Sequence, residues 1–126
     1  MAKNFGLHLT LDLKHCNKNK LKDSSFVYDF LSKFPGIIGM HKITLPYVVK
    51  WLDKFSKGTE GISGFVMIAE SHISVHTFPD QDYAFVDIFS CVNFNTGKCS
   101  KNIVSAFEAK KSTEKVVKRG LDFTRT

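Results

Sequence analysis

Long apolar runs are scarce in this chain of 126 residues. No stretch approaches the roughly 18 to 20 consecutive apolar residues that cross a bilayer. The N-terminus also lacks an apolar core followed by a small-residue cleavage site, which is typical of a secretory signal. We therefore expect a soluble, cytoplasmic protein with no membrane partner.

Cysteine is also rare. The chain has three cysteines, Cys16, Cys91 and Cys99, and their spacing contains no C-x-x-C pair. An odd number of cysteines without paired-ligand spacing argues against a disulfide framework and against a structural zinc site. His72 and His76 lie four positions apart, a spacing that brings two metal ligands together on a helix, whereas their β-branched neighbours indicate a strand. We expect no bound metal.

Arginine is nearly absent, although the chain is basic. Its formal net charge of +6 comes from lysines spread along the sequence, and the only arginines are Arg119 and Arg125. Nucleic-acid surfaces usually cluster their positive charge and favour arginine beside stacking aromatics. We therefore interpret the lysines as a solvated surface and expect no nucleic-acid partner.

Apolar residues, in contrast, are abundant enough for one core. They make up 43% of the chain and include twelve phenylalanines, while 126 residues are too few for two ordinary domains. We expect a single domain, 1–126.

The first half of the chain predicts a strand and a helix. Leucines at 7, 9, 11 and 13 alternate with polar residues, which is the period of a strand with one buried face. Asp23 or Ser24 can cap a helix over about 23–34, and Pro35-Gly36 is expected to end it. Residues 37–46 predict a short strand ending at Pro46. For residues 47–55 a helical turn and an ordered loop both stay open.

The second half predicts an antiparallel meander. Three β-rich runs span about 62–69, 72–78 and 83–91, and a turn-forming segment at 79–82 separates the last two. Asn95 or Thr96 can cap a second helix that runs to about Lys110, and 115–118 predict a last short strand before Gly120. The predicted class is α+β: a two-layer sandwich in which an antiparallel β-sheet is covered on one face by two helices.

The segment 70–77, Glu-Ser-His-Ile-Ser-Val-His-Thr, carries the clearest sign of chemistry. It follows the apolar run 64–69, so its polar groups lie at the end of a buried strand, where an unpaired polar group is costly. Together with Gly-Ile-Ser-Gly at 61–64 and Asp-Ile-Phe-Ser-Cys at 87–91, this segment closely resembles the S-adenosylmethionine decarboxylase family. Those proteins are self-cleaving, pyruvoyl-dependent enzymes of polyamine synthesis.

The resemblance implies a role for each of these residues. Ser71 becomes the pyruvoyl cofactor when the chain splits after Glu70 into a β chain, 1–70, and an α chain, 71–126. Ser63 and His76 assist this processing, and the thiol of Cys91 donates a proton during decarboxylation. The pyruvoyl ketone draws electrons from the bound substrate, so that no metal and no pyridoxal phosphate are needed. For Glu70, a catalytic role and a purely turn-forming role both stay open.

The expected hairpin limits which of these groups can meet. A turn near 69–70 places Ser63 opposite His76, and the next hairpin places Cys91 beside Ser71. At about 3.3 Å per residue, however, His76 lies roughly 15 Å or more from Ser71 along its strand. We therefore expect a homodimer with two composite sites, in which Ser63 and His76 of one subunit face Ser71 and Cys91 of the other.

The substrate is less well defined by the sequence. Family members commonly continue the His-Thr pair with Trp-Pro-Glu, whose carboxylate contacts ribose, whereas this chain has Phe78-Pro79-Asp80. The aromatic residue that stacks on adenine has Phe55 as its nearest counterpart. The resemblance implies S-adenosylmethionine as substrate, with L-arginine or L-ornithine as the alternative for the same scaffold. A catalytically dead binding subunit is a remote alternative.

Overall fold

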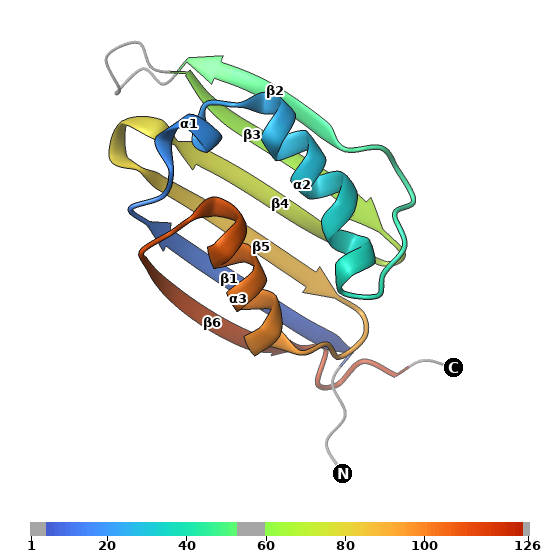
Figure 1. Ribbon diagram of the computed structural model, residues 1–126. Coiled ribbons are helices and arrows are strands. Elements are labelled where there is room, and N and C mark those ends of the chain that lie inside the picture. Colours follow the sequence, from blue (N-terminus) through green and yellow to red (C-terminus); the bar gives the residue numbers. More distant parts are fainter. Residues whose placement is uncertain (1–4, 53–59, 125–126) are drawn as a thin grey trace.

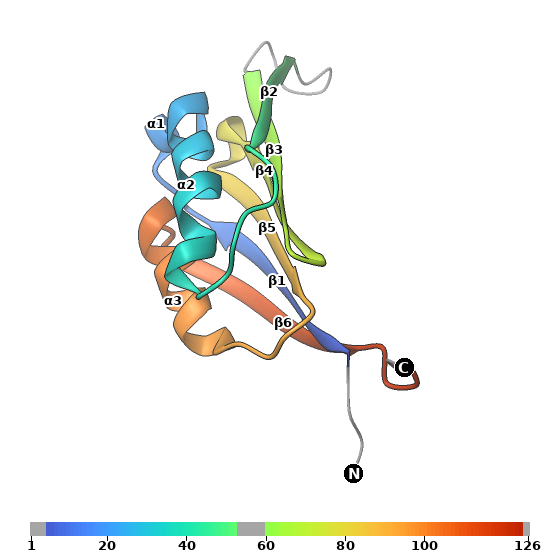
Figure 2. The same ribbon diagram turned by 90° about the vertical axis from the view of Figure 1, so that its right-hand side faces the viewer.

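A six-stranded antiparallel sheet forms the centre of the computed structural model, which describes residues 5–52 and 60–124. Its strands run in the order β2-β3-β4-β5-β1-β6 (Figure 1). The two longer helices, α2 and α3, cover one face of the sheet (Figure 2). The strands are β1 (Gly6–Lys14), β2 (Tyr47–Leu52), β3 (Glu60–Ile68), β4 (Ser71–Phe78), β5 (Tyr83–Ser90) and β6 (Lys111–Arg119); the helices are α1 (Lys18–Leu21), α2 (Ser24–Ile37), the 3-10 turn η1 (Pro79–Gln81) and α3 (Thr96–Phe107).

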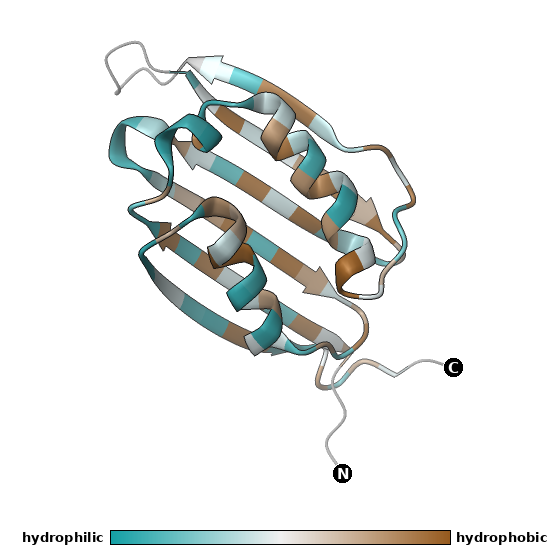
Figure 3. Cartoon of the chain, in the orientation of Figure 1, coloured by the Kyte–Doolittle hydropathy of each residue, from teal (hydrophilic) through white to brown (hydrophobic). Residues whose placement is uncertain are grey.

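The hydrophobic core lies between the helices and the sheet. Alternate residues of each central strand point to the helices, which gives the alternating colours along the strands in Figure 3. Leu9, Leu11 and Leu13 of β1 are almost completely buried and pack in one cluster with Leu31 of α2 and Phe107 of α3. The burial of each such side chain stabilises the fold by about 1.5 to 3 kcal/mol. The predicted α+β class, with an antiparallel sheet covered on one face by helices, is confirmed.

Helix α2 begins as predicted but ends later. The Asp23 carboxylate accepts a hydrogen bond of 2.9 Å from the Ser25 N–H, which caps the helix. The predicted end at Pro35-Gly36 is wrong, since the helix continues to Ile37. In the last turn, Pro35 removes only one helical hydrogen bond, its own side chain is buried, and its carbonyl accepts a 2.7 Å bond from Met40.

The region between α2 and β3 differs most from prediction. The strand predicted over 37–46 is wrong: these residues form the helix end and turns, with a single bridge between Lys42 and Ile68. Residues 47–52, predicted as a helical turn or loop, form strand β2 instead. Their backbone pairs with β3, and Tyr47 lies opposite Phe65. Because the partner strand is distant in the sequence, the residues of 47–52 alone do not indicate a strand. Phe55 lies outside the described residues.

The remaining elements match prediction apart from their lengths. Asn95 caps α3 by accepting a 2.9 Å bond from Lys98, and the helix ends at Phe107 because Glu108 adopts a left-handed φ of 52°. Strand β6 is longer than the predicted 115–118. The short helix α1, capped by Asn17, was not predicted. None of the described helices is both long and apolar enough to span a membrane.

Candidate functional site

The β3–β4 hairpin places Ser71 directly after a strained residue. Ile68 pairs with Ser71, so only Ala69 and Glu70 form the turn, and Glu70 has a φ of 60°. The left-handed conformation costs a residue with a Cβ about 1 to 2 kcal/mol. Ser71 itself is the first residue of β4 and is 6% exposed. The peptide bond between Glu70 and Ser71 therefore joins a strained turn to a buried strand.

Cys91 contacts this turn on both sides of Glu70. Its backbone N–H donates a 2.8 Å hydrogen bond to Oγ of Ser71, and its thiol donates to the carbonyl of Ala69 over 3.4 Å. Cys91 follows the last residue of β5 and is partly exposed. The serine hydroxyl, the turn and the thiol thus form one group at this end of the sheet, which we call the Ser71 end.

Ser63 and His76 form a second group. They lie opposite each other on β3 and β4, and Oγ of Ser63 is 2.8 Å from Nδ1 of His76. This agrees with the register predicted from the sequence. His76 is exposed, so its ring can reach a group from outside the protomer. We call this place the His76 end.

The two ends do not meet within one protomer. Ser71 and His76 are five residues apart on β4, which corresponds to about 16 Å. They also point to opposite faces, since Ser71 shares the buried alternation of Ile73 and Val75, whereas His76 lies on the face that the helices leave open. A base at His76 therefore cannot reach Ser71 of the same chain.

Two of the three predicted substrate residues lie at the His76 end. The partly buried Phe78 contacts Trp51 and Phe85, with ring centroids 5.6 and 5.7 Å apart. Asp80 follows in η1 and is exposed. Phe55, the third, lies outside the described residues.

A histidine cluster beside the Ser71 end was missed. His8 of β1 lies opposite Phe89, its Nδ1 is 3.0 Å from a nitrogen of Arg119, and the His8 and His72 ring centroids are 6.3 Å apart. Burial lowers the pKa of His8; nearby Asp87 opposes this shift, while Arg119 and His72 add to it. Because His8 alternates with the β1 leucines, the sequence could have placed it on the sheet face opposite the helices. The residues near it in the sequence do not indicate its neighbours on β4, β5 and β6.

The three thiols differ in their surroundings. Burial raises the pKa of Cys16 to about 11, with a smaller contribution from Asp82, and raises that of Cys99 to about 12. Both are buried in the core, whereas Cys91 is partly exposed beside the turn. Within the described residues, no group of three or more His, Cys, Asp or Glu side chains is placed to hold a metal ion.

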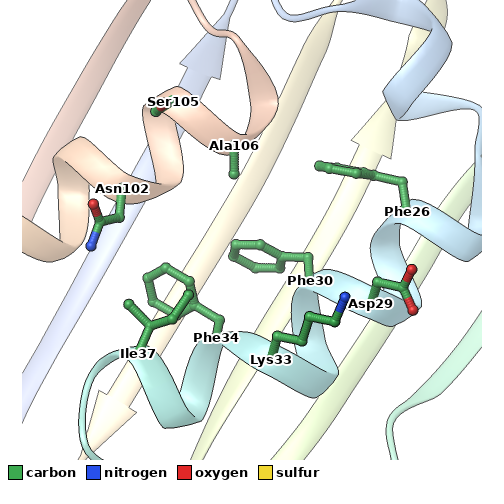
Figure 4. A pocket seen from close by; sticks show the side chains of 9 residues that line it. All are labelled: Phe26, Asp29, Phe30, Lys33, Phe34, Ile37, Asn102, Ser105 and Ala106. Carbon is green, nitrogen blue, oxygen red and sulfur yellow. The ribbon is translucent and has the colours of Figure 1, made fainter.

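A hollow of about 460 Å³ on the helical layer lies apart from both ends of the site. Figure 4 shows the rings of Phe30 and Phe34 on α2 projecting towards Ala106 on α3. None of its lining residues belongs to the 70–77 segment. The full lining consists of Phe26, Asp29, Phe30, Lys33, Phe34, Ile37, Asn102, Ser105 and Ala106.

The sheet face opposite the helices, which we call the open face, combines exposed apolar side chains with the His76 end of the site. Phe65 is 43% exposed, Met67 45% and Phe85 40%, and Tyr47 and Val117 are also exposed. Exposed apolar side chains gathered on one face are typical of a surface that another protein covers.

Comparisons with known proteins identify the family. The family model for S-adenosylmethionine decarboxylase matches residues 7–120. The chain is 32% identical to the S-adenosylmethionine decarboxylase proenzyme of Prochlorococcus marinus, over 90% of this chain and 88% of that protein. It is 34% identical to the proenzyme of the same name from Thermodesulfovibrio yellowstonii, over 92% and 82%.

A solved structure supports the same fold. The crystal structure of the adenosylmethionine decarboxylase from Aquifex aeolicus matches with a TM-score of 0.77, covering 99% of this chain and 98% of that chain at 23% identity. The sequence match spans nearly the whole chain and includes both ends of the site. The chain therefore belongs to the S-adenosylmethionine decarboxylase family.

Proposed function

We propose that this protein is a proenzyme that cleaves itself between Glu70 and Ser71 and then decarboxylates S-adenosylmethionine. Family membership supports the reaction. The observation that carries self-cleavage is the contact of Cys91 with Ser71 and Ala69 around the left-handed Glu70. The family model and the relatives described above carry the name S-adenosylmethionine decarboxylase, and none supports the arginine or ornithine alternative.

In this proposal the chain itself supplies the groups for cleavage. Oγ of Ser71 attacks the carbonyl carbon of Glu70, the peptide C–N bond breaks, and the hydroxyl proton ends on the released amine, which leaves an ester. Removal of the Ser71 α-proton by a base then breaks the Cβ–Oγ bond, which frees Glu70 as a carboxylate and leaves a dehydroalanine at position 71. The dehydroalanine tautomerises to an imine, and water hydrolyses the imine to the pyruvoyl ketone with release of ammonia. The strain at Glu70 favours the first step, because breaking the peptide bond releases the turn.

The residues around Ser71 also fit a pyruvoyl group. Ser71 starts a strand, so a new chain end there would stay anchored by β4. A pyruvoyl ketone at this position would accept electrons as carbon dioxide leaves the substrate. Cys91 is the proton donor that we assign to the substrate's α-carbon, since its thiol lies at the turn and is partly exposed.

We further propose that two copies pair through their open faces. The roughly 16 Å between Ser71 and His76 along β4 supports a site that two chains share. A twofold axis between the two open faces would make the two β4 strands run in opposite directions. The Ser71 end of one copy would then lie against the His76 end of the other. Each composite site would then combine Ser71 and Cys91 with Ser63 and His76 of the other copy, whose Phe78 and Asp80 would contact the substrate. Because the Ser71 side chain points towards the helices, the other copy would approach the Ser71 backbone at the end of β4, where the α-proton is removed.

Mass spectrometry and a substrate assay test the reaction. Intact-mass measurement should find two chains, 1–70 and 71–126, the second lacking a free amine at its start. Labelled carbon dioxide should be released from S-adenosylmethionine and not from L-arginine or L-ornithine. A whole, inactive chain would instead support a binding subunit, and release from arginine alone would overturn the substrate.

A complementation experiment tests the composite site. Ser71→Ala and His76→Ala chains are expected to process poorly when each is expressed alone. In a mixed dimer, one site combines both defects and the other is intact, so the His76→Ala chain should be cut. No cleavage in a mixed dimer verified by mass would place each site within one chain.

A further inference from the structure

The Ser90 side chain stabilises a backbone turn at Cys91. Ser90 is the last residue of β5 and is fully buried. Its hydroxyl donates a 2.8 Å hydrogen bond to the carbonyl of Val92 and accepts a 3.1 Å bond from the N–H of the same residue. One side chain thus binds both backbone polar groups of Val92, and the chain turns at the residue between them, Cys91.

The direction of the Cys91 N–H depends on this turn. The pairing of β5 with β1 ends at Ser90, opposite Leu7, so Cys91 lies beyond the paired residues. Its N–H instead donates to a side-chain oxygen, Oγ of Ser71, at 2.8 Å. A hydrogen bond to a side chain is retained only while both backbone and side chain keep their positions.

Strand β1 supports the same peptide from the other side. A Cβ added to Gly6 would lie 1.8 Å from the carbonyl oxygen of Ser90 and 2.8 Å from the Cα of Cys91. The backbone of β1 therefore touches the Ser90–Cys91 peptide directly, with no space for a side chain. This peptide is held between Gly6 and the turn that Ser90 forms.

We propose that Ser90 is a positioning residue for self-cleavage, because its hydroxyl holds the Cys91 N–H against Oγ of Ser71. The inference rests on the proposed function, in which Ser71 is the attacking group. The N–H orients the oxygen, and it stabilises the negative charge that develops there as the hydroxyl proton leaves. Ser90 touches no reacting atom, and its effect passes through the backbone of Cys91.

The expected size of the effect follows from geometry. A misplacement of about 1 Å in a group that orients a reaction can slow it roughly 100-fold. In Ser90→Ala both polar groups of Val92 lose their partner, but Val92 is 54% exposed and water can replace the hydroxyl. Cleavage should therefore slow by about 10- to 100-fold, while the fold remains intact.

Cell-free synthesis of the full chain, followed by a time course of cleavage, measures this rate before the precursor is consumed. Ser90→Thr keeps a hydroxyl and should stay within about threefold of the wild-type rate, whereas Ser90→Cys, a weaker donor, should fall between Thr and Ala. Ser100→Ala is the matched control, since it removes another buried serine hydroxyl, one that bonds to Glu114 on the helical side of the sheet. It should cleave like the wild type.

Two further measurements separate positioning from a structural role. Thermal unfolding in a Ser71→Ala background, which cannot be cut, should give similar midpoints with and without Ser90→Ala. Hydroxylamine, which cleaves esters, should release no extra product from slowed Ser90→Ala precursor, because the attack itself is slow.

Each result has a defined meaning. Equal rates for Ser90→Ala and wild type, a rate loss explained by unfolding, or an accumulated hydroxylamine-sensitive ester would each overturn the role of Ser90. A wild-type chain that never cleaves would instead overturn the proposed function, so the two failures are distinguishable.

Discussion

The two ends of strand β4 hold their functional groups in opposite ways. At one end, Ser71 is buried and its hydroxyl accepts a hydrogen bond from the backbone of Cys91. At the other, the exposed ring of His76 lies within hydrogen-bond distance of the side chain of Ser63. A group held by backbone is fixed within its own protomer, whereas an exposed side chain can adapt to a partner. The Ser71 end is therefore the rigid half of the proposed site, and the His76 end is the half that a second copy meets.

The largest effect should come from the rigid half. Ser71→Ala removes the only oxygen that can attack Glu70 in the proposed mechanism, so cleavage into 1–70 and 71–126 should stop completely. Ser74→Ala is the control, because Ser74 lies on the same strand, midway between the ends. Intact mass after prolonged incubation measures the outcome. Scission of the Ser71→Ala chain at the same bond would remove Ser71 from the mechanism.

Gly6→Ala should also disturb the Ser71 end, through the backbone of β1. The new Cβ would collide with the backbone of Ser90 and Cys91, and backbone cannot rotate away as a side chain can. We expect a loss of about 3 kcal/mol in the free energy of unfolding, with slowed cleavage.

The control for this substitution is Gly97→Ala. Gly97 lies in the first turn of α3, and the nearest atom to an added Cβ is Oδ1 of Asn95 at 3.7 Å. This change should be neutral or stabilise the fold by up to about 1 kcal/mol. Chemical denaturation measures both variants, and equal stability for the two would contradict the close packing at Gly6.

Thr77, the neighbour of His76 in β4, is fully buried and supports the His76 end. Its hydroxyl accepts a 2.9 Å bond from the N–H of Ile62 and donates a 2.8 Å bond to the carbonyl of Leu21. Thr77→Val keeps the shape but leaves two buried backbone groups unpaired, at about 2 kcal/mol in total. Thr77→Ser keeps both hydrogen bonds and should lose only about 1 kcal/mol for the missing methyl. If chemical denaturation shows that Thr77→Ser is no more stable than Thr77→Val, the hydroxyl does not stabilise this end.

The smallest effect should be a pH dependence at His8. Since burial lowers the pKa of His8 below the 6.5 of a free side chain, the unfolded chain binds a proton more readily than the folded protein. Stability from this source is complete above pH 6.5 and declines as the pH falls from there to the folded pKa. His8→Gln should flatten that decline in thermal melts, whereas His41→Gln, a change at an exposed histidine outside the sheet, should not.

The sequence predicted most of the geometry of the candidate site, because its residues are close together in the hairpins. Once the turn at 69–70 is fixed, the strand period alone sets Ser63 opposite His76. Local spacing could not predict strand β2, whose hydrogen-bond partners come from β3, nor the extension of α2 past Pro35, which depends on tertiary packing. It also could not reveal Ser90 as a turn residue, because a serine that ends a strand has no distinct pattern.

The order of the strands has a consequence for the cut protein. A break after residue 70 would assign β1, β2 and β3 to one fragment and β4, β5 and β6 to the other. In the sheet, however, β1 lies between β5 and β6. The two fragments would therefore be interleaved, and neither could leave without dismantling the ladders on both sides of β1. Scission at the hairpin would alter a single covalent link while the two pieces stay as firmly associated as the intact domain.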